Sequence, residues 1–210
     1  MTYIHFMGRR SDHSRAELEE LILSTGSTLI AETGLAGFSA REVARRIGYS
    51  IGTIHNVFGT ADRLVAAINT RSFKDWAASL RERLNAVGPD GDRIAALVDG
   101  YFGFAREHPH LWTAIFDHRL PPDGGLTEAD ETGRALLTRI VVEEIARAVG
   151  CEVDDEVAAL SRSLIATVHG HCSFAISGAW SLMGEAAPEA AALARVREAL
   201  SAWDVCLTQS

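Results

Sequence analysis

Four side chains that can form hydrogen bonds lie within one short segment, which begins and ends with a glycine. Residues 48–59 read GYSIGTIHNVFG. The segment presents hydroxyl, imidazole and amide groups: Ser50, Thr53, His55 and Asn56. Such groups bind phosphate oxygens or base edges, and an asparagine amide can pair with adenine through two hydrogen bonds. A helix so short, with so many poor helix formers, is unstable alone in water. It therefore needs a supporting helix on one face and a partner on the other.

A second capped helix precedes this segment and can support it. Ser39 and Glu42 have the spacing of a capping box, in which serine caps a free N–H and glutamate reaches back. This predicts a short helix that Gly48 closes, and Ser50 is the next N-cap. Two short capped helices joined by a tight turn are typical of a helix-turn-helix, whose second helix enters the DNA major groove. The alternative, on spacing alone, is a capped helical hairpin on the surface of a bundle.

Within this motif we expect two kinds of position. Ile47, Ile54 and Phe58 should face inward and form core, whereas the absence of a side chain at Gly52 lets the backbone approach closely. Helical periodicity and capping residues continue along the whole chain, and no alternating strand pattern appears. We therefore predict an all-α protein with about nine helices. The longer ones are expected at residues 14–33, 61–87, 92–107, 109–118, 127–149, 153–183 and 188–207. We divide it into an N-terminal arm with the helix-turn-helix (1–60) and a helical ligand-binding and dimerisation domain (61–210).

Charge and composition restrict the function further. Residues 1–75 hold nine Lys and Arg against eight Asp and Glu, and the remainder hold eleven against twenty. This asymmetry suggests that the two parts have different partners. Three scattered cysteines without a CxxC pair, no apolar run long enough to span a membrane, and no secretory apolar segment favour a cytoplasmic protein. No GxSxG, P-loop or GxGxxG motif is present, so we expect neither an enzyme nor a bound cofactor or metal.

Residues Leu18 to Ile68 resemble the DNA-binding domain of the TetR-type (TetR/AcrR) transcriptional regulators. The resemblance rests on these motifs: Phe38-Ser39, Val43-Ala44, Ile47-Gly48, Ser50-x-Gly52-Thr53-Ile54 and Phe58-Gly59. It implies a homodimer that binds a double-stranded DNA operator and is released by a small-molecule effector bound among the C-terminal helices. Most such proteins repress transcription. The expected DNA contacts are Ser39, Arg41, Tyr49, Ser50, Gly52, Thr53, His55 and Asn56.

Three positions depart from the family pattern. Ile51 stands where the family commonly has lysine, and His55 and Asn56 stand where an aromatic residue and histidine are usual. One phosphate contact is thereby lost, so Arg41, Tyr49 and the N-terminal arm should carry more of the affinity. These changes affect the expected operator sequence rather than DNA binding itself.

The larger part of the chain carries an aromatic cluster. Its segment from Tyr101 to Phe116 and the later Val168-His169-Gly170 are similar to a C-terminal class named after a Trp-His-Gly signature, with valine in place of tryptophan. An apolar effector pocket is one interpretation of the aromatic residues, and ordinary core packing is the other. The candidate ligand-binding residues are Tyr101, Phe102, Phe104, Trp112, Phe116, His169 and Ser173, and Phe174 and Trp180 belong to the same cluster.

Other functions remain open at this point. His169 and Cys172, at i and i+3, share a helix face and would supply half of a metal site, although a core histidine and a buried cysteine are favoured. A metal or redox sensor that also uses Cys151 is therefore one alternative. Another is a small-molecule carrier or enzyme with a helix-turn-helix that no longer binds DNA. The helices at 152–183 and 188–207 are expected to form the dimer interface, with a monomeric core as the alternative. The adjacent Glu143-Glu144 pair is expected at the solvated surface.

Overall fold

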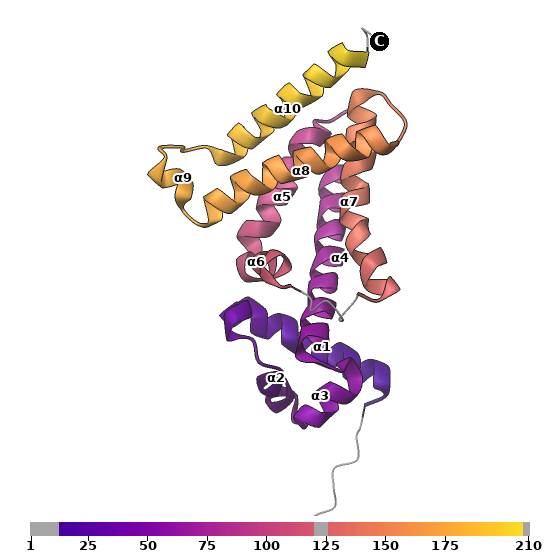
Figure 1. Cartoon of the computed structure of the whole chain (residues 1–210), viewed down its shortest axis with the longest axis vertical. Helices are drawn as coiled ribbons and strands as arrows, with labels where there is room; N and C mark the ends of the chain where they lie inside the picture. Colours follow the sequence, from indigo (N-terminus) through magenta and orange to yellow (C-terminus); the bar gives the residue numbers. More distant parts are fainter. Residues whose placement is uncertain (1–12, 120–125, 208–210) are drawn as a thin grey trace, which may run out of the picture.

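The computed structural model describes residues 13–119 and 126–207, and within these ranges the chain is helical with no strand. Figure 1 shows a slender molecule with a small three-helix group at one end and a larger bundle at the other. Ten α-helices and one 3₁₀ turn (η1, Leu35–Gly37) make up the described part. The α-helices are α1 Arg15–Thr33, α2 Ala40–Ile47, α3 Ile51–Phe58, α4 Ala61–Val87, α5 Arg93–Glu107, α6 Pro109–Asp117, α7 Glu128–Val149, α8 Asp155–Ile176, α9 Ala179–Leu182 and α10 Pro188–Leu207.

The all-α prediction is confirmed, but the single helix expected at residues 153–183 is wrong. Gly178 has φ +76°, a left-handed conformation that glycine adopts without strain, and it ends the helical path after α8. The one-turn helix α9 follows, and its Trp180 indole donates a hydrogen bond to the carbonyl of His171 at 2.8 Å. The α-helices of the described part therefore number ten rather than about nine.

Of the capping box predicted at Ser39 and Glu42, only the serine cap is correct. Ser39 caps α2 by accepting a hydrogen bond from the amide of Glu42 at 3.4 Å. The Glu42 carboxylate does not reach back to the cap; it binds Arg45 at 2.7 Å and Arg46 at 3.1 Å. These arginine hydrogen bonds lower the pKa of Glu42 to about 2. The reciprocal capping box occurs instead at Ser14 and Glu17, where α1 begins.

The two larger of three apolar clusters, here the lower and the upper core, both include residues of α4. The third and smallest joins α4, α5 and α7 around Leu80 and Leu97. The lower core unites α1, α2 and α3 around Ile22, Val43 and Ile54, and it includes Leu64 and Ile68 from α4. Two turns further along α4, Trp76 lies in the upper core among α5, α6, α7, α8 and α10. The predicted division after residue 60 therefore falls just before a helix that both cores share. No helix in the described ranges is long and apolar enough to cross a membrane.

A buried ion pair fixes the far end of the upper bundle. Arg93, the first residue of α5, makes two 2.6 Å hydrogen bonds to the Glu144 carboxylate on α7. Arg93 also donates to the carbonyls of Leu84 and Gly88, where α4 ends. The Glu144 side chain is 8% exposed, so the expectation of a solvated Glu143-Glu144 pair is wrong for Glu144. One arginine thus connects three helices.

Replacing Arg93 by methionine should destabilise the fold by about 3 kcal/mol, because it leaves a nearly buried carboxylate without its main partner. Urea denaturation followed by circular dichroism measures this change. The double variant Arg93→Met/Glu144→Leu should recover much of the loss, since it removes both charges. Arg139→Gln, which breaks an exposed pair with Glu143 at 4.0 Å, is the control and should change stability by less than about 0.5 kcal/mol. A loss as small as the control's would show that the Arg93 pair contributes nothing specific.

Candidate DNA-reading helix and aromatic site

The helix α3 is held by caps at its start and by apolar side chains on one face. Gly48, with φ +75°, turns the chain out of α2, and the Ser50 hydroxyl accepts a hydrogen bond from the Thr53 amide at 3.3 Å. Ile54 is 1% exposed in the lower core, with Ile51 and Val57 packed partly against it. This support explains how a short, polar helix with an internal glycine is stable here.

The opposite face of α3 is open at the end of the molecule (Figure 1). Six of the eight predicted DNA-contacting residues are exposed and two are half-buried. The exposed ones are Ser39, Arg41, Ser50, Gly52, His55 and Asn56, and the half-buried ones are Tyr49 and Thr53. All eight are thus at least partly accessible to solvent, while their roles in binding DNA stay predictions.

Several of these polar groups already have partners within the protein. The Ser50 and Thr53 hydroxyls lie 3.1 Å apart, and His55 Nδ1 lies 2.9 Å from the Gly59 carbonyl oxygen. The Tyr49 hydroxyl hydrogen-bonds to Nδ1 of His13 at 2.9 Å, which ties the turn to the residue before α1. The Asn56 amide has no hydrogen-bond partner within residues 13–119 and 126–207. Asn56 therefore offers a free donor and acceptor at the centre of this face.

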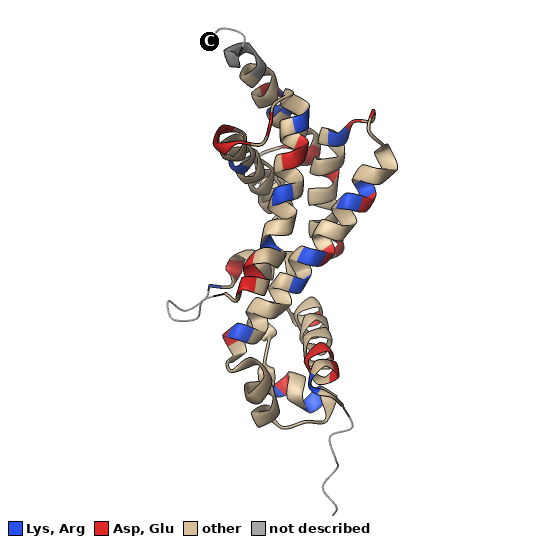
Figure 2. Cartoon of the chain, turned by 90° about the vertical axis from the view of Figure 1, so that its right-hand side faces the viewer, with Lys and Arg blue, Asp and Glu red and all other residues tan. Residues whose placement is uncertain are grey.

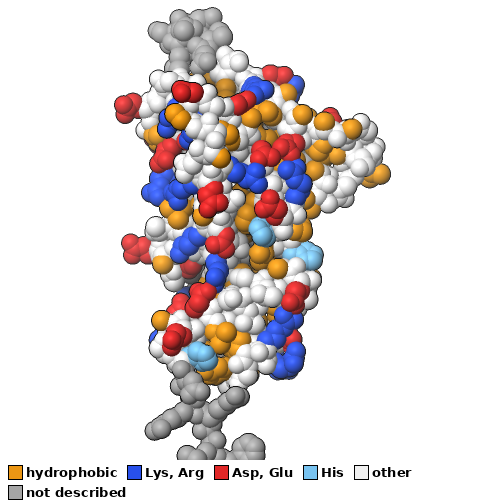
Figure 3. Space-filling view, turned by 180° about the vertical axis from the view of Figure 1, so that it is seen from behind, with side chains coloured by type: hydrophobic (Ala, Val, Ile, Leu, Met, Phe, Trp, Pro, Cys, Tyr) orange, Lys and Arg blue, Asp and Glu red, His pale blue; other side chains and the backbone are white. Residues whose placement is uncertain are grey.

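The positive charge of this region is smaller than the sequence suggests. Arg45 binds Glu42, and Arg46 binds both Glu42 and Glu32, at distances of 2.7 to 3.1 Å. Arg41, exposed beside them, forms no ion pair within the described residues. Figures 2 and 3 accordingly show mixed rather than uniformly basic colouring around the three-helix end. Arg41 is the cation of this segment that is available to a phosphate group.

Of the three side chains expected to face inward, only Ile54 is fully buried. Ile47 and Phe58 pack against the lower core but are half-buried, and Phe58 also lines a cavity between the two cores. The buried position on α3 is Ile54, one turn earlier.

Four of the seven predicted ligand-binding residues come together in the upper bundle. The Tyr101 hydroxyl lies 2.9 Å from Nδ1 of His169, whose ring contacts Trp112 and Phe116 at centroid distances of 5.3 and 4.3 Å. These four residues, Tyr101, Trp112, Phe116 and His169, are called the aromatic site below. Phe104 instead stacks on Trp76 at 4.7 Å, and Phe102 lines a separate groove beside α10. Ser173 is half-buried further along α8.

Burial keeps the polar groups of the aromatic site neutral. Desolvation lowers the pKa of His169, and it raises that of the Tyr101 phenol. Desolvation also raises the pKa of the Cys172 thiol to about 12. A thiol held protonated is a poor metal ligand and nucleophile. In the part of the chain that the structure describes, no three His, Cys, Asp or Glu side chains are placed to hold a metal ion.

The side chains of the aromatic site pack on one another, but some of their hydrogen-bonding groups have no partner. Tyr101 also lines a neighbouring apolar cavity of only about 40 Å³, which is large enough for a water molecule and not for an organic ligand. The indole N–H groups of Trp76 and Trp112 are buried without a hydrogen-bond partner. Since buried donors normally find an acceptor, a ligand with an acceptor atom would fit here once the exposed Phe116 ring moves.

The short helix α6 connects the aromatic site to the lower core. Trp112 faces the upper core, whereas Ala114 is fully buried in the lower one. Asn69 of α4, 1% exposed, donates a hydrogen bond to the Ala114 carbonyl at 3.0 Å. His110 Nδ1 lies 2.8 Å from the Ala31 carbonyl oxygen of α1. A movement of Trp112 therefore changes the contacts that α6 makes with α1 and α4. Sequence patterns did not reveal this link, because Asn69 and His110 belong to no motif.

Comparison with known proteins gives matches along both parts of the chain. Residues 22–68 match the family model described as bacterial regulatory proteins, tetR family, and residues 94–200 match the one described as tetracyclin repressor-like, C-terminal domain. An HTH-type transcriptional regulator of Mycobacterium bovis is 26% identical over 137 residues, which cover 64% of this chain. The match spans only 57% of the length of that curated relative.

Solved structures share the fold at low sequence identity. A protein of unknown function from Rhodococcus sp. RHA1 superposes with a TM-score of 0.70 at 20% identity, covering 93% of this chain and 98% of that one. RolR in complex with resorcinol gives a TM-score of 0.62 at 15% identity, covering 89% and 93%. Neither family description names a Trp-His-Gly class, so that assignment stays a prediction.

Proposed function

The chain belongs to the TetR family of bacterial regulatory proteins, and we propose that it is a cytoplasmic repressor released from its operator by a small effector. The observation that carries the DNA-binding part is the outward face of α3, where Asn56 offers an unpaired amide on a helix anchored by the buried Ile54. Asn56 would read a base edge, while Arg41 and the Ser50 hydroxyl would bind phosphates.

Asn56→Ala should weaken operator binding about tenfold or more, because a good base contact is worth on the order of 1–3 kcal/mol. The melting temperature should stay unchanged, since Asn56 is exposed and makes no internal hydrogen bond. Gel shifts with the gene's own upstream DNA, at several salt concentrations, measure the effect. Asn85→Ala is a matched control, because Asn85 is equally exposed but lies at the opposite end of α4.

The same gel shifts separate this proposal from its main competitor. A small-molecule carrier or enzyme with an inactive helix-turn-helix would show no specific complex. A DNA-binding regulator should lose affinity steeply as salt rises, since bound cations release counterions from the phosphates. If the Asn56→Ala variant binds operator DNA as tightly as the unchanged protein, the base contact assigned to Asn56 is wrong.

The effector proposal rests on the neutral, packed aromatic site. An apolar molecule with one or two acceptor atoms would stack among Trp112, Phe116 and His169 and accept from the unpaired Trp112 N–H. RolR, which has this fold, binds resorcinol, a small aromatic molecule of that kind. Opening the site moves α6, and through Asn69 and His110 it moves α4 and α1. Effector and operator would then favour different arrangements of the same helices.

A screen of small aromatic compounds by thermal shift should yield stabilising hits, and each hit should bind less tightly when operator DNA is present. Thermodynamic linkage requires the two effects to be equal. Operator DNA must lower the affinity for the effector by the same factor by which the effector lowers the affinity for operator DNA. Tyr101→Phe, which removes the hydroxyl that orients His169, should weaken such hits several-fold. The exposed Ser24→Ala on α1, outside the aromatic site and the α8 face, is the control. A compound that binds equally tightly with and without operator DNA binds the protein but does not act as an inducer.

We also propose that two copies pair through α8 and α10, which lie together as the outer layer of the bundle (Figure 1). The apolar residues Val196 and Leu200 of α10 are already buried within one chain. The outer face of α8 instead carries the exposed small residues Ala159, Ala166 and Gly170, against which a second helix pair can approach closely. Two α3 helices would then reach the two halves of a palindrome. Sedimentation should find a dimer at micromolar concentration, and a stable monomer would count against the pairing.

A further inference from the structure

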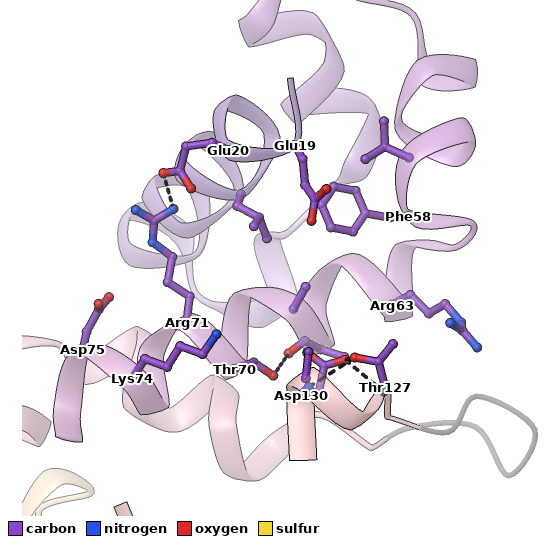
Figure 4. A pocket seen from close by; sticks show the side chains of 15 residues that line it. Glu19, Glu20, Phe58, Arg63, Thr70, Arg71, Lys74, Asp75, Thr127 and Asp130 are labelled. Carbon is purple, nitrogen blue, oxygen red and sulfur yellow. Dashed lines mark hydrogen bonds and ion pairs between the residues drawn. The ribbon is translucent and has the colours of Figure 1, made fainter. Parts of the chain in front are cut away.

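A second cavity lies at the junction of the two cores, outside the aromatic site. It measures about 490 Å³ and is walled by α1, the end of α3, the first half of α4 and the start of α7 (Figure 4). Its apolar surface comes from small and aromatic side chains: Leu23, Val57, Phe58, Ala66 and Ala67. The half-buried position of Phe58 is a consequence of this opening. A volume of this size suits a small organic molecule.

Three of the seven charged side chains that line the junction cavity already have partners. Arg71 of α4 binds Glu20 of α1 at 2.6 Å across one side of the opening. The Asp130 carboxylate accepts hydrogen bonds from the backbone amide and hydroxyl of Thr127. Arg63 and Asp75 form no ion pair within the described residues, but in Figure 4 Arg63 points away from the cavity and Asp75 lies at its far end.

The two remaining charges are of opposite sign and unpaired among the described residues, and both side chains are exposed to solvent. Glu19 of α1 and Lys74 of α4 form no ion pair or hydrogen bond with any residue in 13–119 or 126–207. Figure 4 shows Glu19 beside the Phe58 ring on one wall and Lys74 beside Thr70 on another. Each faces the space between, and neither is near enough to the other to form an ion pair. Between its apolar walls the cavity thus presents one unpaired anion and one unpaired cation, besides the charges described above.

Lys74 is the one lysine of the sequence, and a glycine on α7 leaves room for its side chain. The other nineteen basic residues are arginine. A Cβ atom at Gly133 of α7 would come within 2.7 Å of Lys74 Cε and 2.8 Å of Thr70 Cγ2. The glycine therefore leaves room for the lysine stem to lie across α7. This packing restricts the ammonium group to the neighbourhood of the cavity.

We propose that the junction cavity binds a small zwitterion with an apolar side group, such as a molecule of the amino acid class. Its ammonium group would bind Glu19, its carboxylate would bind Lys74, and its side group would pack on Phe58 and Leu23. Because Glu19 and Lys74 are exposed, a ligand with one charge alone would form only one of the two ion pairs and leave the other protein charge in water. Because two walls belong to the three-helix end and two to the bundle, an occupant would fix their relative position. This site does not depend on the operator or on the aromatic site.

Calorimetry of the full-length dimer or monomer, without DNA, tests the proposal with three compounds that share one ring: phenylalanine, phenethylamine and phenylpropionate. Phenylalanine should bind at least about tenfold more tightly than either singly charged analogue. Glu19→Gln should remove its advantage over phenylpropionate, and Lys74→Met should remove its advantage over phenethylamine. Glu143→Gln and Arg139→Gln, an exposed pair on α7 outside the cavity, should change nothing.

A second readout locates the ligand. Reductive methylation with isotope-labelled methyl groups keeps the charge of the amine, and Lys74 is the only side chain that it modifies. Phenylalanine and phenylpropionate should shift this single lysine signal, whereas phenethylamine should shift it less. The proposal is overturned if phenylalanine fails to bind at millimolar concentration, if the three compounds bind alike, or if they bind without moving the Lys74 signal. None of these outcomes bears on DNA binding, which the gel shifts measure separately.

Discussion

The uninterrupted helix α4 is the constraint on which the rest of the structure depends. Leu64 and Ile68 near its start complete the lower core, and Trp76 two turns later lies in the upper core. The Ile68 side chain packs directly on the backbone of α1 at Gly26. A Cβ atom at that glycine would lie 2.6 Å from Ile68 Cδ1, so a larger residue would clash there. Neither core is complete without α4, so the three-helix end has no independent means of folding or tilting. A change in the bundle that moves α4 moves α3 with it.

The helix α6 adds a second connection, and it carries the aromatic site. Trp112 contacts His169, while Ala114, two residues later, is buried in the lower core and receives the hydrogen bond of Asn69. Asn69 Oδ1 is buried with no partner, so this contact is held at some energetic cost and has a polar group ready for another arrangement. A small effector therefore does not need to act over a long distance. In the proposed mechanism it would need only to displace one short helix that both cores share. The junction cavity, walled by α1, α3, α4 and α7 and not by α6, would be a second and separate ligand site.

Local signals in the sequence predicted much of this, and failed where side chains from distant segments meet. Ser39, Gly48 and Ser50 predicted the boundaries of α2 and α3 correctly, because caps act on their own helix ends. The same reasoning misplaced Glu42, which prefers two arginine partners to a backbone amide, and Glu144, whose burial depends on Arg93 fifty-one residues earlier. Gly178 falls inside the helix predicted at residues 153–183, although it ends the helical path there. The grouping of Tyr101 with His169, the bridging role of Asn69 and the cavity beside Phe58 depend on tertiary packing, which periodicity does not encode.

The central claim, that α4 and α6 make the two cores one cooperative unit, is tested most directly by unfolding the protein while two signals are recorded. All four tryptophans, Trp76, Trp112, Trp180 and Trp203, follow the three-helix end, so their fluorescence reports on the bundle alone. Far-ultraviolet circular dichroism reports on every helix, including α1, α2 and α3. At one protein concentration the two urea transitions should coincide in midpoint and slope. A loss of helical signal that precedes the fluorescence change would show that the three-helix end melts alone, and it would contradict the shared-core account.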